Sequence, residues 1–276
     1  MIGRAAAVLK TMASGDAVAA PIMIVAAHPD DETIGMGAQL WRLHNALLLQ
    51  VTDGAPRDGR DAAAHGYAGV AEYAFARGVE LRAALEAGRA GGVRTEVVGI
   101  PDQEACFELI SLTQRISQLL RETAPAAIFT QAYEGGHPDH DAAAFAVAAA
   151  VWLIAAEGRS PPAILEMTGY HADGPRFATG TFLAADRPIT TIELDAADRR
   201  RKQSMIDCFT SQRDLLARFD LETERFREAP NYDFLQPPQP GELYYETLRW
   251  SITGEIWRRQ ARGALDELGL HAPPWA

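Results

Sequence analysis

Ala26-Ala27-His28-Pro29-Asp30-Asp31-Glu32 places one imidazole and three carboxylates within seven residues. The apolar run before it, 21–27 (PIMIVAA), is rich in β-branched side chains and is typical of a buried strand. Apolar residues at helical spacing over 33–44 indicate a helix after it. The stretch is therefore predicted to be a strand-to-helix turn. In an open parallel sheet, such a turn lies at the carboxyl end of the strand, where ligands bind.

His28 and Asp31 stand three residues apart across this turn, so an imidazole nitrogen and a carboxylate oxygen can reach one cation. Zinc accepts both ligand types, and in hydrolases it keeps one position open for water. Asp30 is then free to act as a base. The alternative is that the acids only cap the following helix, since acidic residues are favoured at a helix start.

A second cluster, Gly135-Gly136-His137-Pro138-Asp139-His140-Asp141, decides between these interpretations. It also follows a β-like run, 126–132 (AAIFTQA), and precedes an Ala-rich helical stretch, 142–156. Residues at two strand ends come together in an α/β fold, although they are far apart in the chain. Two matched clusters favour a metal site over helix capping.

The fold class predicted from the whole chain is α/β, with a mostly parallel, doubly wound sheet and helices on both faces. It depends on the alternation of strands and helices up to residue 156. Strands are predicted at 21–27, 46–51, 96–100 and 126–132, and helices at 33–44, 70–90, 107–122 and 142–156. Further strands are expected at 163–170 and 189–194, a long helix from Asp195 or Asp198 to about 219, and a helix at 254–268.

Domain organisation follows from the lack of an internal repeat or linker in the sequence. We expect a single domain over 1–276, with 1–20 as a short helix or a loose N-terminal extension. No secretory-type apolar region is present, and we expect no run of membrane-spanning length. A cytoplasmic protein without membrane insertion is predicted.

The composition of the chain limits the classes of partner that it is expected to bind. The net charge of −11 argues against a nucleic-acid or anionic-membrane surface and favours a small or neutral substrate. Two cysteines do not make a disulfide framework, which fits a reducing compartment.

Other candidate residues carry weaker signals. Asp102 follows the predicted strand at 96–100, where it is either a site carboxylate or a turn former. Arg77 and Glu80 share a helix face at i, i+3, which by itself suggests only a surface ion pair. His171 follows another strand and is a minor candidate for the site.

Two loops are expected to border the site. The Gly- and Asp-rich segment 53–68 begins with Asp53-Gly54, which is a turn signal first and a site candidate second. The Pro-rich segment 229–241, with Tyr232, Phe234 and the nearby Tyr244 and Tyr245, forms either a wall of the substrate pocket or part of the core.

AHPDDE at 27–32 and HPDH at 137–140 resemble the motifs of the PIG-L/LmbE family of zinc-dependent N-acetylglucosaminyl deacetylases. The two motifs stand in the family's order, each after a strand. Weaker similarity covers 21–155, and the C-terminal third is only loosely alike. The resemblance implies a Rossmann-like α/β domain, in agreement with the alternation of elements.

The resemblance also implies a role for each motif residue. His28, Asp31 and His140 would be the zinc ligands, and Asp30 the general base. His137 would stabilise the oxyanion and protonate the leaving amine.

Three further roles come from the same resemblance. Asp139 would hold His137 in the required tautomer and favour its charged form. Arg77 and Asp102 look like contacts to sugar hydroxyls. Gly135 stands where the mycothiol enzymes of the family have a tyrosine, so a mycothiol precursor is less favoured as the substrate.

The expected activity is metal-dependent removal of an N-acetyl group from an N-acetylglucosamine-type sugar or glycoconjugate. Zinc is preferred, and ferrous iron also accepts these ligands. The alternatives are an amidohydrolase acting on a non-sugar N-acyl or thiol-conjugate amide, and a non-catalytic zinc-containing carbohydrate-binding protein. Binding alone needs neither Asp30 nor His137. A nucleotide-binding protein is disfavoured because the first turn lacks Gly-x-Gly-x-x-Gly. The aglycone, the pathway and the oligomeric state stay open.

Overall fold

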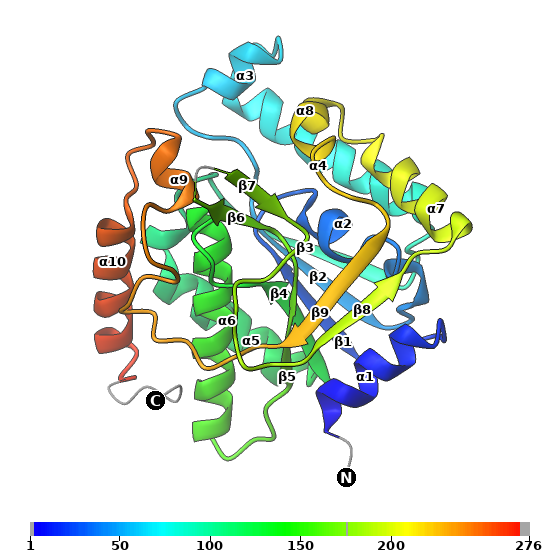
Figure 1. The fold of residues 1–276 in the computed structure, drawn as a ribbon. Helices are drawn as coiled ribbons and strands as arrows, with labels where there is room; N and C mark the ends of the chain where they lie inside the picture. The colour runs from blue at the N-terminus through cyan, green and yellow to red at the C-terminus, as the bar shows by residue number, and fades with distance from the viewer. Residues whose placement is uncertain (1–2, 175, 271–276) are drawn as a thin grey trace.

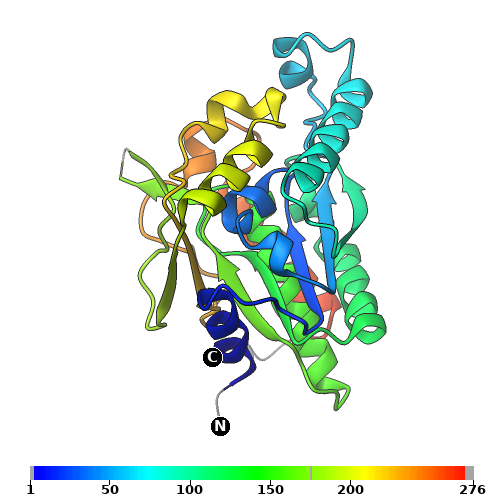
Figure 2. The same cartoon turned by 90° about the vertical axis from the view of Figure 1, so that its right-hand side faces the viewer.

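A seven-stranded mixed sheet forms the centre of the fold, with helices on both faces (Figures 1 and 2). The computed structural model describes residues 3–174 and 176–270. In spatial order the strands are β3 (Val93–Ile100), β2 (Ala46–Thr52), β1 (Ile22–Ala26), β4 (Ala127–Gln131), β5 (Ala163–Met167), β9 (Thr223–Glu228) and β8 (Ile189–Glu193). The first five are parallel to one another, and β9 is antiparallel to both β5 and β8. The predicted α/β class is confirmed.

Alternating side chains of the central strands fill two cores, one on each face of the sheet. Met23 and Val25 of β1 belong to the core on one face, and Ile22, Ile24 and Ala26 to the core on the other. The first core includes residues of α5 (Leu109–Thr123), α6 (Pro138–Ala156) and α10 (Gly254–Glu267). The second includes residues of α1 (Arg4–Ala13), α2 (Asp31–Met36), α4 (Val70–Ala87) and α7 (Ala196–Ile206).

The strand order reverses between β1 and β4, and this reversal positions the two motifs. The chain moves outward from β1 to β2 and β3 and then returns to the other side of β1 as β4. The crevice at the carboxyl ends of two such neighbours is the usual ligand position in α/β sheets. The turn after β1 carries 27–32, and the loop after β4 leads into 137–140.

Two predicted helices are broken in the structure. The helix expected over 33–44 is divided into α2 and η1 (Leu40–Arg42), where Ala38 N–H leaves the helix and donates to the buried Glu224 carboxylate at 2.9 Å. Gly35 and Gly37 lower the helix propensity there. The helix expected from Asp195 or Asp198 to about 219 is divided into α7, η3 (Thr210–Gln212) and α8 (Arg213–Leu216).

The strand β9 and a hairpin were missed by the sequence prediction. β9 reads TERFRE, and its buried positions include the charged residues Glu224 and Arg227, which hide the apolar pattern. The strand predicted at 163–170 is β5 followed by β6 (Tyr170–Asp173), which pairs with β7 (Arg176–Thr179). The remaining short elements are α3 (Arg60–Ala64), η2 (Ala105–Phe107) and α9 (Tyr244–Thr247).

The N-terminal segment is more than a loose extension. Helix α1 buries Ala5, Val8, Leu9 and Met12 in the second core. The predicted domain over 1–276 includes residues 1–2 and 271–276, which lie outside the described residues.

Helix α6 corrects the expectation that no run is long enough to span a membrane. Pro138–Ala156 has the length and composition of a spanning helix, with a mean hydropathy of 1.4. In the fold 67% of this window is buried, and the helix packs against β4 and α5. Its apolar character is that of a core helix.

A buried ion pair fixes α2 to the antiparallel side of the sheet. Lys202 Nζ donates to Glu224 Oε1 at 2.8 Å and to the Ile34 carbonyl at 2.7 Å. Glu224 also accepts from Gln39 Nε2 at 3.0 Å. Lys202 and Glu224 are each 1% exposed. The pair therefore links α7, β9 and the segment that carries the first motif.

Replacing Lys202→Met is expected to lower the free energy of unfolding by about 3–5 kcal/mol, because Glu224 would be left buried without a countercharge. Denaturant titration measures the change. Arg200→Met, on the exposed side of the same helix, is the control and should change this free energy by no more than about 0.5 kcal/mol. Equal losses in the two variants would contradict the role of the pair.

Candidate active site

His28, Asp31 and His140 converge in the crevice between β1 and β4. His28 Nδ1 lies 3.2 Å from Asp31 Oδ2, and His140 Nε2 lies 3.1 Å from Asp31 Oδ1. All three residues are buried, and they offer ligand atoms within 4.8 Å of one another. Among the described residues, His140 Nε2 has no hydrogen-bond partner, although it approaches Asp31 closely. Two imidazoles and one carboxylate directed at a shared point fit zinc, and they also fit ferrous iron.

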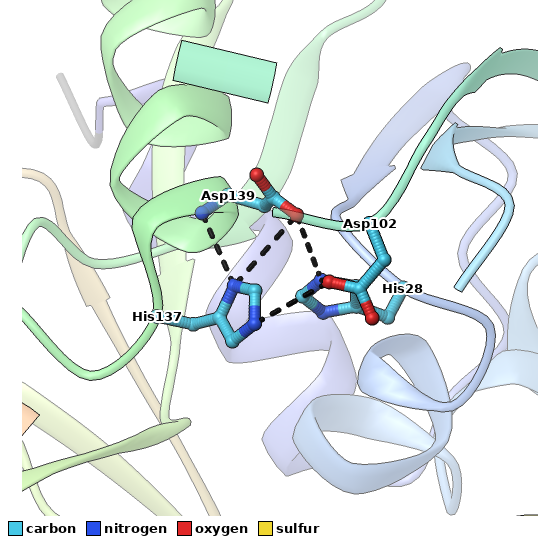
Figure 3. A group of neighbouring side chains, drawn as sticks. All are labelled: His28, Asp102, His137 and Asp139. Atoms are coloured by element: carbon cyan, nitrogen blue, oxygen red, sulfur yellow. Dashed lines mark hydrogen bonds and ion pairs between the residues drawn. The ribbon is translucent and has the colours of Figure 1, made fainter. Parts of the chain in front are cut away.

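The other nitrogen of His28 is held by carboxylates on the opposite side of the ring (Figure 3). His28 Nε2 lies 3.2 Å from Asp139 Oδ2 and 3.3 Å from Asp102 Oδ1. Asp139 is fixed in turn by the backbone N–H groups of Gln103 at 2.6 Å and Ala105 at 3.0 Å. An Nε2–H donated to Asp139 leaves Nδ1 free for a metal ion, which is the usual arrangement behind a metal-binding histidine.

The charged groups around His28 also shift its pKa and that of Asp31. Burial alone would lower the pKa of His28, but the carboxylates of Asp102, Asp139 and Asp31 outweigh it and raise the pKa well above its usual value. The pKa of Asp31 is lowered well below its usual value, because His140 and His28 outweigh the effect of burial. The pocket thus favours positive charge at the point where these groups meet.

Asp139 has a different partner from the one predicted. His137 Nδ1 accepts the backbone N–H of Asp139 at 3.2 Å and lies 3.8 Å from the Asp139 carboxylate, which bonds to His28 (Figure 3). The backbone, and not the carboxylate, therefore fixes the tautomer of His137 and leaves its proton on Nε2. Burial and the neighbouring His28 lower the pKa of His137 well below its usual value, so the neutral ring is favoured, contrary to the prediction.

Asp30 is held in an unusual backbone conformation next to the convergent residues. Its φ of 141° is rare for a residue with a side chain, and strain of this kind costs about 1–3 kcal/mol. Its N–H donates to Glu32 Oε2 at 3.2 Å, and its Oδ2 accepts from Arg77 Nη2 at 3.1 Å. Burial raises the pKa of Asp30 to about 6, although the Arg77 guanidinium acts against the rise. A carboxylate of this kind suits general-base chemistry near neutral pH.

Arg77 lies behind Asp30 and is not on the surface. The expected pair with Glu80 is present, with Arg77 Nη1 4.0 Å from Glu80 Oε2, but Arg77 is 2% exposed and Glu80 7%, so the pair is buried and its expected position on the surface is wrong. Glu80 accepts hydrogen bonds from the backbone and side chain of Ser211 at 2.9 and 2.6 Å. Arg77 also lines the cavity, and its contact with a sugar hydroxyl stays a prediction.

Asp102 reaches the site from β3, the edge strand. Its Oδ1 lies 3.3 Å from His28 Nε2 and 3.5 Å from His137 Nε2 (Figure 3). The nearby His28 lowers the pKa of Asp102, outweighing the effect of burial, so the carboxylate stays charged. Its predicted contact with a sugar hydroxyl likewise remains a prediction.

The cavity above these groups has a volume of about 190 Å³. Its walls include Tyr244, which the sequence indicated as a possible pocket wall, and Tyr170 and Trp250, which it did not indicate as site residues. The Trp250 ring lies 4.9 Å from the His137 ring, and the Tyr170 ring lies 5.1 Å from the His140 ring. These aromatic residues come from the C-terminal half, where no motif marks them.

The two loops expected to border the site behave differently. Segment 53–68 contributes Gly54 and Asp61 to the cavity, as expected. Segment 229–241 does not line it, because Tyr232 hydrogen-bonds Glu166 and Phe234 is buried in the first core. Asp53 forms a turn, with its carboxylate accepting Ala55 N–H at 2.9 Å.

Comparison with known proteins finds a family model that matches the part of the chain that carries both motifs. Residues 23–151 match the family model described as PIG-L, GlcNAc-PI de-N-acetylase. The matched part contains most of β1, both motifs and most of α6. This part of the chain resembles the PIG-L/LmbE family, in agreement with the two motifs.

Solved structures share the fold of this chain at low sequence identity. The zinc-inhibited form of teicoplanin deacetylase Orf2 has a TM-score of 0.55 at 16% identity, covering 75% of this chain and 97% of the other. The A40926 pseudoaglycone deacetylase Dbv21 gives 0.53 at 18%, covering 76% and 97%. N,N'-diacetylchitobiose deacetylase from Pyrococcus horikoshii gives 0.53 at 16%, covering 80% and 89%. No curated protein matches the chain in sequence.

The geometry predicts one tightly bound divalent ion per chain, and Asp31→Ala should remove it, because Asp31 approaches both histidines. Elemental analysis after dialysis against zinc measures the stoichiometry. Asp58→Asn, which removes a half-exposed carboxylate from the nearby loop, is the control and should keep one ion per chain. Retention of the ion by Asp31→Ala would contradict the predicted ligand set.

Proposed function

We propose that this protein is a zinc-dependent hydrolase that removes the N-acetyl group from an N-acetylglucosamine-type sugar or glycoconjugate. The products would be acetate and a free amine. The observation that carries the proposal is Asp30, a buried carboxylate with a pKa of about 6, which stands beside the three convergent residues without being one of them. Metal binding alone would not need a further carboxylate there. Similarity to teicoplanin deacetylase and N,N'-diacetylchitobiose deacetylase supports the choice of an N-acetyl sugar.

His28, Asp31 and His140 would hold the ion. When bound, zinc would polarise the acetamide carbonyl and lower the pKa of a water molecule to about 7. Ferrous iron suits the same ligands.

The residues around the ion would move the protons. Asp30 would take a proton from the attacking water, and Arg77 would keep the Asp30 carboxylate in place and deprotonated. His137 carries its proton on Nε2, facing the cavity that the substrate would enter. This N–H would donate a hydrogen bond to the oxyanion, a kind of stabilisation worth about 3–4 kcal/mol. Because the neutral His137 ring has no second proton to give, Asp30 would pass the proton taken from the water to the departing amine. Asp102 would orient His137 or bind a sugar hydroxyl.

A second candidate is an amide whose amine is not a sugar. It is favoured by the apolar part of the cavity wall, which includes Ile34, Leu215 and Leu248. In either case we propose a small-molecule substrate, since the net charge of −11 disfavours nucleic acid as a partner. We also propose that the enzyme is cytoplasmic.

The substrate class is tested by acetate release from a panel of N-acetylglucosamine compounds and non-sugar N-acyl amines, using metal-free protein with and without zinc. Asp30→Asn should lower the zinc-dependent rate by about 10²–10⁴-fold while the zinc content stays unchanged, because only the proton acceptor is lost. Asp58→Asn is again the control. Full activity of Asp30→Asn would refute its role as the base, and zinc-dependent release only from non-sugar amides would favour the second candidate.

The acid limb of kcat/KM should report the Asp30 carboxylate, which must be deprotonated to act as a base. Activity should therefore fall as the pH drops through about 6. Arg77→Met should move this limb upward by about 1–3 pH units, since the guanidinium lowers the pKa of Asp30. Ser211→Ala removes a neighbour of Arg77 without removing the charge, so it should leave the limb in place. An unshifted limb in Arg77→Met would show that another group controls it.

A further inference from the structure

His140 has one nitrogen whose partner the described residues do not supply. Its Nε2 faces Asp31, and its Nδ1 on the other side of the ring is buried without a hydrogen-bond partner in this part of the chain. A histidine that binds a metal through one nitrogen keeps a proton on the other and normally donates it to a carboxylate, a carbonyl or a water. For His28 this acceptor is Asp139. The corresponding acceptor for the Nδ1 proton of His140 is not evident from its hydrogen bonds.

Glu134 offers the matching acceptor. It lies in the loop between β4 and α6, is 1% exposed, and its Oε1 has no hydrogen-bond partner among the described residues. A Cβ atom added at Gly169 would lie 3.3 Å from Glu134 Oε1 and 3.7 Å from His140 Nδ1. An unpaired acceptor and an unpaired donor therefore border the same small space beside Gly169.

The other oxygen of Glu134 is already held. Glu134 Oε2 lies 3.1 Å from His171 Nδ1, and His171 is 5% exposed on β6. The Glu134 backbone N–H donates to Asp141 Oδ1 at 3.1 Å, and Asp141 directly follows His140 in α6. These contacts fix Glu134 beside the helix turn that carries His140.

We infer that Glu134, held by His171, accepts the Nδ1 proton of His140, either directly or through one water, and so orients His140 toward the metal ion. Glu134 is a positioning residue and His171 its support. The inference rests on the metal site of the proposed function. Each candidate histidine ligand would then have a carboxylate behind it, Asp139 for His28 and Glu134 for His140.

Zinc affinity tests this inference without any substrate. Competition with a chelator should show that Glu134→Ala weakens zinc binding by about 10–100-fold, the usual effect of losing such a partner. Glu134→Gln keeps an acceptor oxygen and should lose less, and His171→Ala should also lose less, because Glu134 itself remains. In the cobalt-substituted protein, the visible absorption bands should shift in Glu134→Ala, since the imidazole would be reoriented.

A matched control separates positioning from general destabilisation. Glu166→Gln removes another buried carboxylate on β5, which accepts hydrogen bonds from Arg227 on β9 and from Tyr232 and does not line the metal cavity. It should lower the thermal stability but leave zinc affinity and the cobalt spectrum unchanged. Wild-type zinc affinity in Glu134→Ala, or a loss no greater than in Glu166→Gln, would overturn the inference. Absence of zinc binding in the wild-type protein would instead refute the metal site of the proposed function.

Discussion

The site depends on the carboxylate of Asp139, which joins three segments that the sheet alone would leave apart. It accepts backbone N–H groups from Gln103 and Ala105 after β3 and contacts His28 after β1, while Asp139 itself lies in the first turn of α6. Because β3 is the edge strand, its end would otherwise lie two strands away from β1. Charge-assisted bonds to a fully buried carboxylate are strong enough to hold such a loop over the crevice.

Burial of so many ionisable groups in one crevice is tolerable only because their charges are complementary. Four carboxylates, three histidines and one arginine meet there: Asp30, Asp31, Asp102, Asp139, His28, His137, His140 and Arg77. Arg77 forms an ion pair with Asp30, so the other three carboxylates surround His28 with negative charge. A divalent cation would relieve this excess, and the arrangement is then easier to understand as a binding site than as a structural ion-pair network.

The sequence predicted the site residues whose positions follow from a local turn or from the order of the strands. A turn after a buried strand fixes His28 and Asp31 locally, and the strand order brings His140 to them. The partners of the Asp139 carboxylate could not be predicted, since they depend on how the loop at 101–108 folds back over the crevice. β9 was missed because its buried charges depend on partners far away in the chain, Lys202 and Glu166. Tyr170 and Trp250 reach the cavity from elements that carry no motif.

At Asp30 the backbone conformation lowers the stability of the fold, while the side chain serves the chemistry of the site. A φ of 141° is easy for glycine and unfavourable for any other residue, so local folding preference alone would select glycine there. The carboxylate is kept in place by contacts on either side, from Glu32 to the backbone and from Arg77 to the side chain. Replacement by glycine would relax the turn, and random drift toward a more stable fold would therefore tend to erase this residue. Its presence in a strained turn is a sign that selection acts on what the side chain does.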